Sequence, residues 1–193
     1  MSLEPSRPGT RLAGVTRLWT GKGDDGTTGL LYGGRAPKSS PRFEAVGHLD
    51  EAQAAIGMAR AEARDRPELD AVLVGLERDL WVLMAEVATD APNHPKLVDG
   101  QSRVTAGMVE ALEALADDIG GRFELPSEFV VPGQDRLSAL LDVARTVARR
   151  AERASVPVAE DGSQIIPYLN RLSSVLWTLA RWVEGEPLLS RER

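Results

Sequence analysis

The sequence predicts an all-α protein, a five-helix up-and-down bundle that follows a glycine-rich N-terminal segment. Two observations carry this prediction. From about residue 42 onward, apolar residues and alanines recur at the three-and-four spacing of amphipathic helices. Proline or glycine residues interrupt this pattern at intervals and leave short connectors, which suit helices packed as an up-and-down bundle.

The first two predicted helices span residues 42–64 and 67–90. In the first, Phe43, Val46, Leu49 and Ile56 alternate with many alanines, which suits a helix with one closely packed face. Pro67 separates it from the second helix, which ends before the segment APNHP. The second helix should turn these residues inward: Leu69, Val72, Leu73, Leu76, Leu80 and Leu83.

Three further helices are predicted at residues 105–121, 137–155 and 165–184. Thr105 is a suitable N-cap for the third helix, and the Gly120-Gly121 pair is a suitable stop. The segment FVVPGQ, between the third and fourth helices, is a short extended piece. Aromatic residues at helical spacing usually belong to the core, so we expect Trp81, Trp177 and Trp182 there.

The 193 residues suffice for one well-buried domain, which we place at residues 17–186. Residues 1–16, rich in proline, glycine and arginine, are expected to form a flexible arm, and residues 187–193 a C-terminal tail. No run of about 18 apolar residues and no signal-peptide core occurs. We therefore expect a soluble cytoplasmic protein with no membrane partner.

Composition excludes several kinds of site. A net charge of -6 argues against a protein that binds nucleic acid electrostatically. The absence of cysteine excludes disulfides, thiolate metal sites and a cysteine nucleophile. The two histidines, His48 and His94, are far apart, so the sequence predicts no metal site made of protein ligands.

The segment GKGDDGTTG, residues 21–29, is the most unusual part of the N-terminal region. Glycine clusters weaken a fold unless the chain must turn sharply or approach a ligand, and phosphates are common occupants of such loops. The Walker pattern nearly fits, but Thr27 stands at the lysine position and no helix follows. Two interpretations stay open, a phosphate-binding loop, with Lys38 and Arg42 as further contacts, and a turn between two short extended segments.

The fourth predicted helix carries four arginines within nine residues of an acidic protein. Its helical wheel places Arg145, Arg149, Glu152 and Arg153 on one side and a row of alanines on the other. Arginine forks suit phosphate, so this face is either a polyphosphate clamp or an ordinary solvated surface. On the fifth helix, Asn170 is either a ligand contact or a polar-face residue.

The first helix carries Glu44, Asp50 and Glu51 beside its alanine face. A carboxylate buried there needs a cation, and we expect an ion pair between helices with Arg145 or Arg149 as partner.

Four segments, taken together in order and spacing, resemble the PduO-type ATP:cob(I)alamin adenosyltransferases. These are TGKGDDGTTGL, RAPKSSPRFEAVGHLDEAQAAIG, FVVPG followed by ARTVARRAER, and YLNRLSSVLW. The resemblance implies a homotrimeric five-helix bundle with ATP at subunit interfaces. It also implies attack of cobalt(I) on the 5′ carbon of ATP, with loss of triphosphate. Mg²⁺ on the triphosphate, a flavin-type reductase and an adenosylcobalamin-dependent client enzyme are implied as partners.

The resemblance also implies roles for individual residues. Asp50 and Arg145 match an ion pair between subunits beside the corrinoid, and Phe129 matches an aromatic that displaces the lower axial base. Trp177 takes the place of a phenylalanine that lines the corrinoid pocket. The remaining matches contact or support the nucleotide: Thr20, Lys22, Gly23, Gly26, Thr27, Thr28, Lys38, Arg42, Arg149, Glu152 and Asn170.

Several positions depart from the family pattern, and they concern the corrinoid side more than the ATP side. They are Trp19, Gly21, Gln53, Gln134, Ser174 and Trp177. An alternative function with the same fold is an adenosylcobalamin carrier or sensor with little turnover. The phosphate-contact residues favour turnover, because a pure carrier would not need them.

Overall fold

The computed structural model describes residues 19–191 and confirms a helical bundle. Its five α-helices are Pro41–Glu62 (α1), Pro67–Val87 (α2), Ala106–Gly120 (α3), Arg136–Ser155 (α4) and Ile165–Glu184 (α5). Two short 3₁₀ helices, Ala91–Lys96 (η1) and Val156–Val158 (η2), lie in the connections. The predicted arm at residues 1–16 lies outside the described residues.

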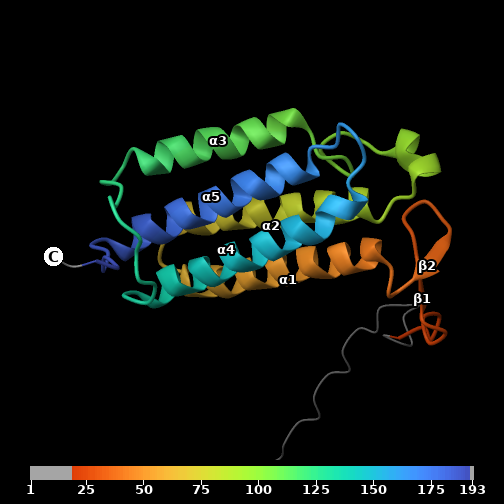
Figure 1. The fold of residues 1–193 in the computed structure, drawn as a ribbon, viewed down its shortest axis with the longest axis horizontal. Helices are drawn as coiled ribbons and strands as arrows, with labels where there is room; N and C mark the ends of the chain where they lie inside the picture. Colours follow the sequence, from red (N-terminus) through yellow and green to blue (C-terminus); the bar gives the residue numbers. More distant parts are fainter. Residues whose placement is uncertain (1–18, 192–193) are drawn as a thin grey trace, which may run out of the picture.

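A small hairpin precedes the bundle. Strands Thr27–Gly29 (β1) and Arg35–Pro37 (β2) pair antiparallel, with Thr28 opposite Ala36. Figure 1 shows this hairpin at the end of the bundle where α1 begins.

The long helices lie side by side in Figure 1, with α4 between α1 and α5. Helix α2 packs on α1, and α3 packs on α5. The predicted alanine faces explain the close α1–α4 pair, because small side chains let two helix axes approach. Fully buried alanines line both helices at this contact: Ala45, Ala52 and Ala59 of α1, and Ala144, Ala148 and Ala151 of α4.

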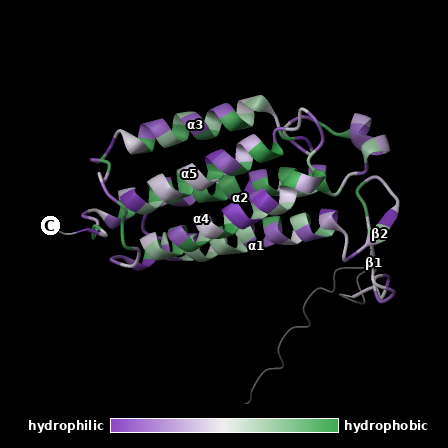
Figure 2. Cartoon of the chain, in the orientation of Figure 1, coloured by the Kyte–Doolittle hydropathy of each residue, from purple (hydrophilic) through white to green (hydrophobic). Residues whose placement is uncertain are grey.

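Leucines of α2 and α5 form a large part of the rest of the core. Figure 2 shows hydrophobic and hydrophilic positions alternating along each helix, as amphipathic helices require. The predicted inward leucines of α2 are buried, as are these residues of α5: Tyr168, Leu169, Leu172 and Leu176. No helix among residues 19–191 is both long and apolar enough to cross a membrane.

The helix ends follow recognisable local signals. The Thr105 side chain accepts a hydrogen bond from the Met108 amide at 3.3 Å, and α3 ends at Gly120 with Gly121 as its C-cap, at the predicted Gly-Gly stop. Asp135 caps α4 in the same way, accepting from the Ser138 amide at 2.9 Å. Helices α1 and α2 end two and three residues before their predicted ends at 64 and 90.

The structure of the single chain contradicts two predictions about side chains, the core position of Trp81 and the partner in the ion pair between α1 and α4. Trp81 is 65% exposed and does not belong to the core, because it lies beside the leucine stripe of α2 rather than in it. The ion pair between α1 and α4 forms between Glu51 and Arg150, instead of using Arg145 or Arg149. The hydrogen bond from Arg150 is the main cause that lowers the pKa of Glu51. Trp182 does pack against the core.

Candidate functional site

The glycine-rich segment forms a compact loop ahead of the hairpin. Residues 21–26 make two consecutive turns, in which the Asp24 amide donates to the Gly21 carbonyl and the Gly26 amide to the Gly23 carbonyl, each at 3.2 Å. The chain then enters strand β1 and not a helix, so the segment is not a P-loop of the Walker type.

Lys38 lies directly against this loop. A Cβ atom added to Gly23 would lie 2.9 Å from Lys38 Nζ and 3.2 Å from the Thr27 carbonyl oxygen. The Lys38 amide also donates to the Gly26 carbonyl at 2.9 Å. A side chain at position 23 would therefore displace the Lys38 ammonium group from the loop backbone. The structure thus brings together the predicted loop and its predicted cation.

Arg35 organises the loop, and the sequence analysis missed it. Its Nε donates to Thr27 Oγ1 at 2.8 Å and its Nη2 to the Lys22 carbonyl at 2.5 Å. Asp25 accepts from the Thr27 amide and hydroxyl at 2.9 and 2.8 Å. These Thr27 hydrogen bonds, followed by the charge of Arg35, lower the pKa of Asp25. No periodic pattern reveals such a clamp, because it joins a turn to a strand across the hairpin.

Arg42 is used within the fold. Its Nη1 donates to the carbonyls of Val87 and Thr89, at 2.5 and 2.8 Å, where α2 ends. A cation at the C-terminus of a helix satisfies free carbonyls and complements the helix dipole. Arg42 therefore ties the start of α1 to the end of α2.

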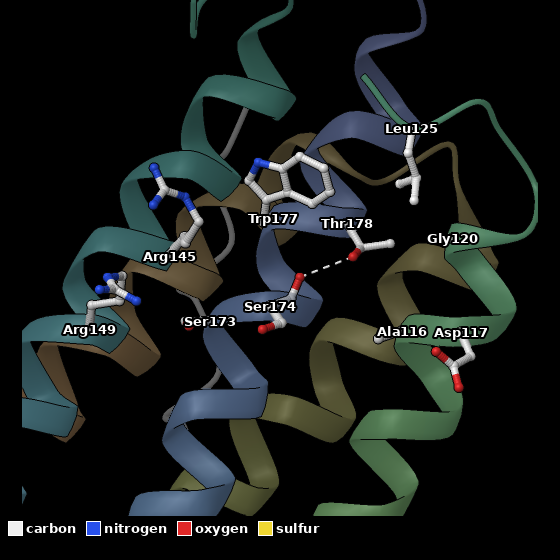
Figure 3. A pocket seen from close by; sticks show the side chains of 10 residues that line it. All are labelled: Ala116, Asp117, Gly120, Leu125, Arg145, Arg149, Ser173, Ser174, Trp177 and Thr178. Carbon is white, nitrogen blue, oxygen red and sulfur yellow. Dashed lines mark hydrogen bonds between the residues drawn. The ribbon is translucent and has the colours of Figure 1, made fainter. Parts of the chain in front are cut away.

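A second group of predicted residues lines an open pocket of about 540 Å³ between α3, α4 and α5 (Figure 3). Arg145 and Arg149 reach it from α4, and Trp177 reaches it from α5. Helix α3 closes one side, and these residues complete the lining: Ala116, Asp117, Gly120, Leu125, Ser173, Ser174 and Thr178. A pocket of this size is in the range that holds small ligands.

Arg145 is oriented by its own helix. Its Nε donates to Asp142 Oδ1 at 3.0 Å, and Asp142 Oδ2 in turn accepts from the buried Arg181 at 2.6 Å. This arrangement fixes one edge of the Arg145 guanidinium and turns the side chain toward the pocket that it lines.

Glu152 of α4, about one turn after Arg149, contacts Asn170 of α5. Asn170 Nδ2 donates to Glu152 Oε1 at 3.3 Å, and Arg171 donates to Asn170 Oδ1 at 2.8 Å. Arg171 also bonds Glu113 of α3 at 2.7 Å. The sequence analysis did not single out Glu113, and the hydrogen bonds link α4, α5 and α3 beside the pocket.

Phe129 lies in a neighbouring hollow of about 380 Å³ and is 86% exposed. Trp177 lines both this hollow and the arginine pocket, so the two are adjacent. The predicted core position of Trp177 is therefore only partly correct: the side chain is half-buried and faces two cavities.

The third location is the outer face of α1 and α2. Asp50 is exposed there in a hollow that Gln53 and Trp81 also line. The loop and its hairpin lean toward the end of α2, where the Leu31 amide donates to the Ala88 carbonyl at 2.9 Å. Within one chain, therefore, neither Asp50 nor the loop lines the pocket that holds Arg145 and Arg149.

Among residues 19–191, no group of three or more histidine, aspartate or glutamate side chains is placed to hold a metal ion.

Comparison with known proteins decides the family. The family described as cobalamin adenosyltransferase matches residues 18–183, which include the loop, the arginine pocket and Asp50. The chain belongs to the cobalamin adenosyltransferase family.

Named members of this family match most of the chain. The corrinoid adenosyltransferase of Mycobacterium tuberculosis H37Rv is 40% identical over 175 residues, which is 86% of this chain and 88% of that protein. The corrinoid adenosyltransferase PduO of Salmonella typhimurium is 37% identical over 168 residues, 85% of this chain and 48% of that protein.

A solved structure of the family agrees with the fold. It is a variant of the PduO-type ATP:corrinoid adenosyltransferase from Lactobacillus reuteri, complexed with cobalamin and ATP. It aligns with this family member at a TM-score of 0.81 and 25% identity, over 91% of this chain and 97% of that one. The predicted family and bundle are confirmed.

Proposed function

We propose that this adenosyltransferase moves the 5′-deoxyadenosyl group of ATP to the cobalt(I) of cob(I)alamin or a related corrinoid. Cobalt(I) supplies the electron pair for a new cobalt–carbon bond, and the bond between C5′ and the triphosphate oxygen breaks. Triphosphate leaves with that electron pair. The observation that carries this function is the family match over residues 18–183, which spans every group of site residues described above.

The protein supplies position and charge in this reaction, because the nucleophile belongs to the corrinoid. The backbone donors of the loop, with Lys38, suit the triphosphate, whose negative charge increases as it leaves. Arg149, with the Asn170–Glu152 hydrogen bond, suits the remainder of the nucleotide. Mg²⁺ would bind through the phosphates, consistent with a site that has no carboxylate cluster among the described residues.

Assembly as a homotrimer would bring the separate groups together. One chain holds the loop and Asp50 on different surfaces from Arg145 and Arg149. A head-to-tail ring places one surface of each subunit against another surface of its neighbour. The exposed Trp81 beside Asp50 suits such a contact, since aromatic residues are enriched in interfaces. In solution, light scattering should then give about three times the 20.8 kDa mass of one chain.

The Phe129–Trp177 hollow suits the corrinoid, because it is lined by large apolar side chains next to the arginine pocket. Phe129 is proposed to displace the lower axial base, which leaves cobalt(II) four-coordinate and easier to reduce. A flavin-type reductase, an adenosylcobalamin-dependent client and a cytoplasmic location complete the proposal.

An anaerobic assay with chemically reduced cob(I)alamin, ATP and Mg²⁺ tests the function. We expect the cobalt(I) spectrum to be replaced by that of a light-sensitive alkylcobalamin, with one triphosphate released per product. Tight binding of adenosylcobalamin without turnover would instead indicate a carrier.

A further inference from the structure

Phe129 lies in the connection between α3 and α4, which contains no helix. With 86% of its surface exposed, the ring has few neighbours that could fix its position. An aromatic that must displace a metal ligand has to be held against the opposing force, so a support for this segment is required.

The C-terminal segment supplies that support. After α5 the chain turns at Gly185, whose φ is +75°, and runs back beside the α3–α4 connection (Figure 1). The Ser190 amide donates to the Phe129 carbonyl at 2.7 Å, and the Val131 amide donates to the Leu188 carbonyl at 2.8 Å. These two bonds flank an antiparallel bridge between Val130 and Leu189.

The same segment is anchored by its side chains. Leu189 is half-buried in a hollow that it shares with Phe123, Leu125 and Pro126 of the α3–α4 connection. Leu125 lines both this hollow and the arginine pocket. The α3–α4 connection, which carries Phe129, therefore lies between the C-terminal segment and that pocket.

We propose that residues 187–191 support the segment that carries Phe129 without lining the corrinoid site themselves, and that the Ser190 amide is a positioning group that holds Phe129 for displacement of the axial base. The inference rests on the proposed function. It gives a role to a segment that the sequence analysis treated as a tail outside the domain.

Ser190→Pro tests this directly, because proline lacks the N–H that bonds the Phe129 carbonyl. Ser190→Ala is the matched control, since it removes the hydroxyl and keeps the N–H. In Ser190→Pro with bound cob(II)alamin and ATP, the magnetic circular dichroism signal of four-coordinate cobalt(II) should fall about three- to tenfold, as expected for loss of one backbone hydrogen bond. With a reduced flavin as the electron donor, turnover that starts from cobalt(II) should fall equally.

Turnover that starts from chemically prepared cob(I)alamin should stay within about twofold of the unmodified protein in both variants, because that reaction needs no axial-base displacement. A chain that ends at Pro187 should behave like Ser190→Pro, and it replaces that variant if proline prevents folding.

Three results would overturn the proposal: a normal four-coordinate signal in Ser190→Pro, an equal loss in Ser190→Ala, or an equal loss of turnover from cobalt(I). Phe129→Ala separates this proposal from the proposed function. If Phe129→Ala keeps normal turnover from cobalt(II), the role of Phe129 itself is wrong. If Phe129→Ala loses turnover from cobalt(II) and Ser190→Pro does not, the proposed support by the C-terminal segment is wrong.

Discussion

Arg181 should be the most important charged residue for stability. It lies in α5 with only 3% of its side chain exposed, between two carboxylates that are also buried. Its Nη2 lies 2.6 Å from Asp142 Oδ2, and its Nε lies 3.0 Å from Glu184 Oε2. Ser138 donates to the other Glu184 oxygen at 3.2 Å.

Arg181→Met keeps much of the side-chain volume and removes the charge. Breaking a buried ion pair by removing one partner costs about 3–5 kcal/mol, and we expect the lower end because Asp142 keeps Arg145 as a partner. A loss of about 3 kcal/mol lowers the melting temperature of a domain of this size by roughly 10 °C.

Arg60→Met is the matched control. Arg60 also has two carboxylate partners, Asp70 at 2.8 Å and Glu77 at 3.7 Å, but its side chain is 43% exposed. Exposed ion pairs contribute about 1 kcal/mol or less, so this variant should melt within about 4 °C of the unmodified protein.

Circular dichroism melts of both variants, at one pH and protein concentration, provide the comparison. Adding Glu184→Gln to Arg181→Met should recover part of the loss, because it removes the buried charge that is left without an ionic partner, whereas Asp142 keeps Arg145. If Arg181→Met melts at the same temperature as Arg60→Met, burial does not set the value of these ion pairs and the reasoning fails.

Two further predictions concern the loop and α2. Gly23→Ala should raise the KM for ATP roughly tenfold with little change in melting temperature, since its Cβ would displace the Lys38 ammonium group. Gly29→Ala, which meets nothing within 4 Å, should leave the KM unchanged, and equal effects of the two would contradict the proposed phosphate role of Lys38. Burial raises the pKa of Asp79 above its usual 3.8, although Tyr168 donates to it. The folded state therefore binds more protons than the unfolded state above pH 3.8, and this contribution to stability decreases as the pH rises. The melting temperature of Asp79→Asn should accordingly rise relative to the unmodified protein between about pH 4 and pH 7, whereas a constant difference would contradict the account.

The helices could be predicted from the sequence because their signals are local. The apolar repeat and its flanking residues placed the fifth helix at residues 165–184, where α5 lies. The leucine spacing of α2 identified its buried side chains. Trp81 was wrongly assigned to the core because the prediction relied on its being aromatic. It directly follows the buried Leu80 on α2, so its side chain turns away from the core.

Contacts between distant segments could not be predicted in this way. The sequence pointed to Arg145 or Arg149 as the partner of the α1 carboxylates, but Arg150 pairs with Glu51, and Arg145 and Arg149 line the pocket between α3, α4 and α5. The Arg35 clamp on Thr27 lies in a hairpin with strands of three residues, and the bond from Ser190 to Phe129 joins two loops, so neither has a repeat long enough to predict it. The site residues themselves were identified by resemblance to the family motifs.

We propose that each site combines the loop of one subunit with the α4–α5 pocket of its neighbour. Co-expression of Lys38→Ala chains with Arg149→Ala chains tests it most directly, because each variant alone lacks one half of every site. In randomly mixed trimers about a quarter of the sites would combine an intact loop with an intact pocket, so about a quarter of normal adenosyltransferase activity should return. If verified mixed trimers stay as inactive as either parent, the two halves do not meet across subunits and the account is wrong.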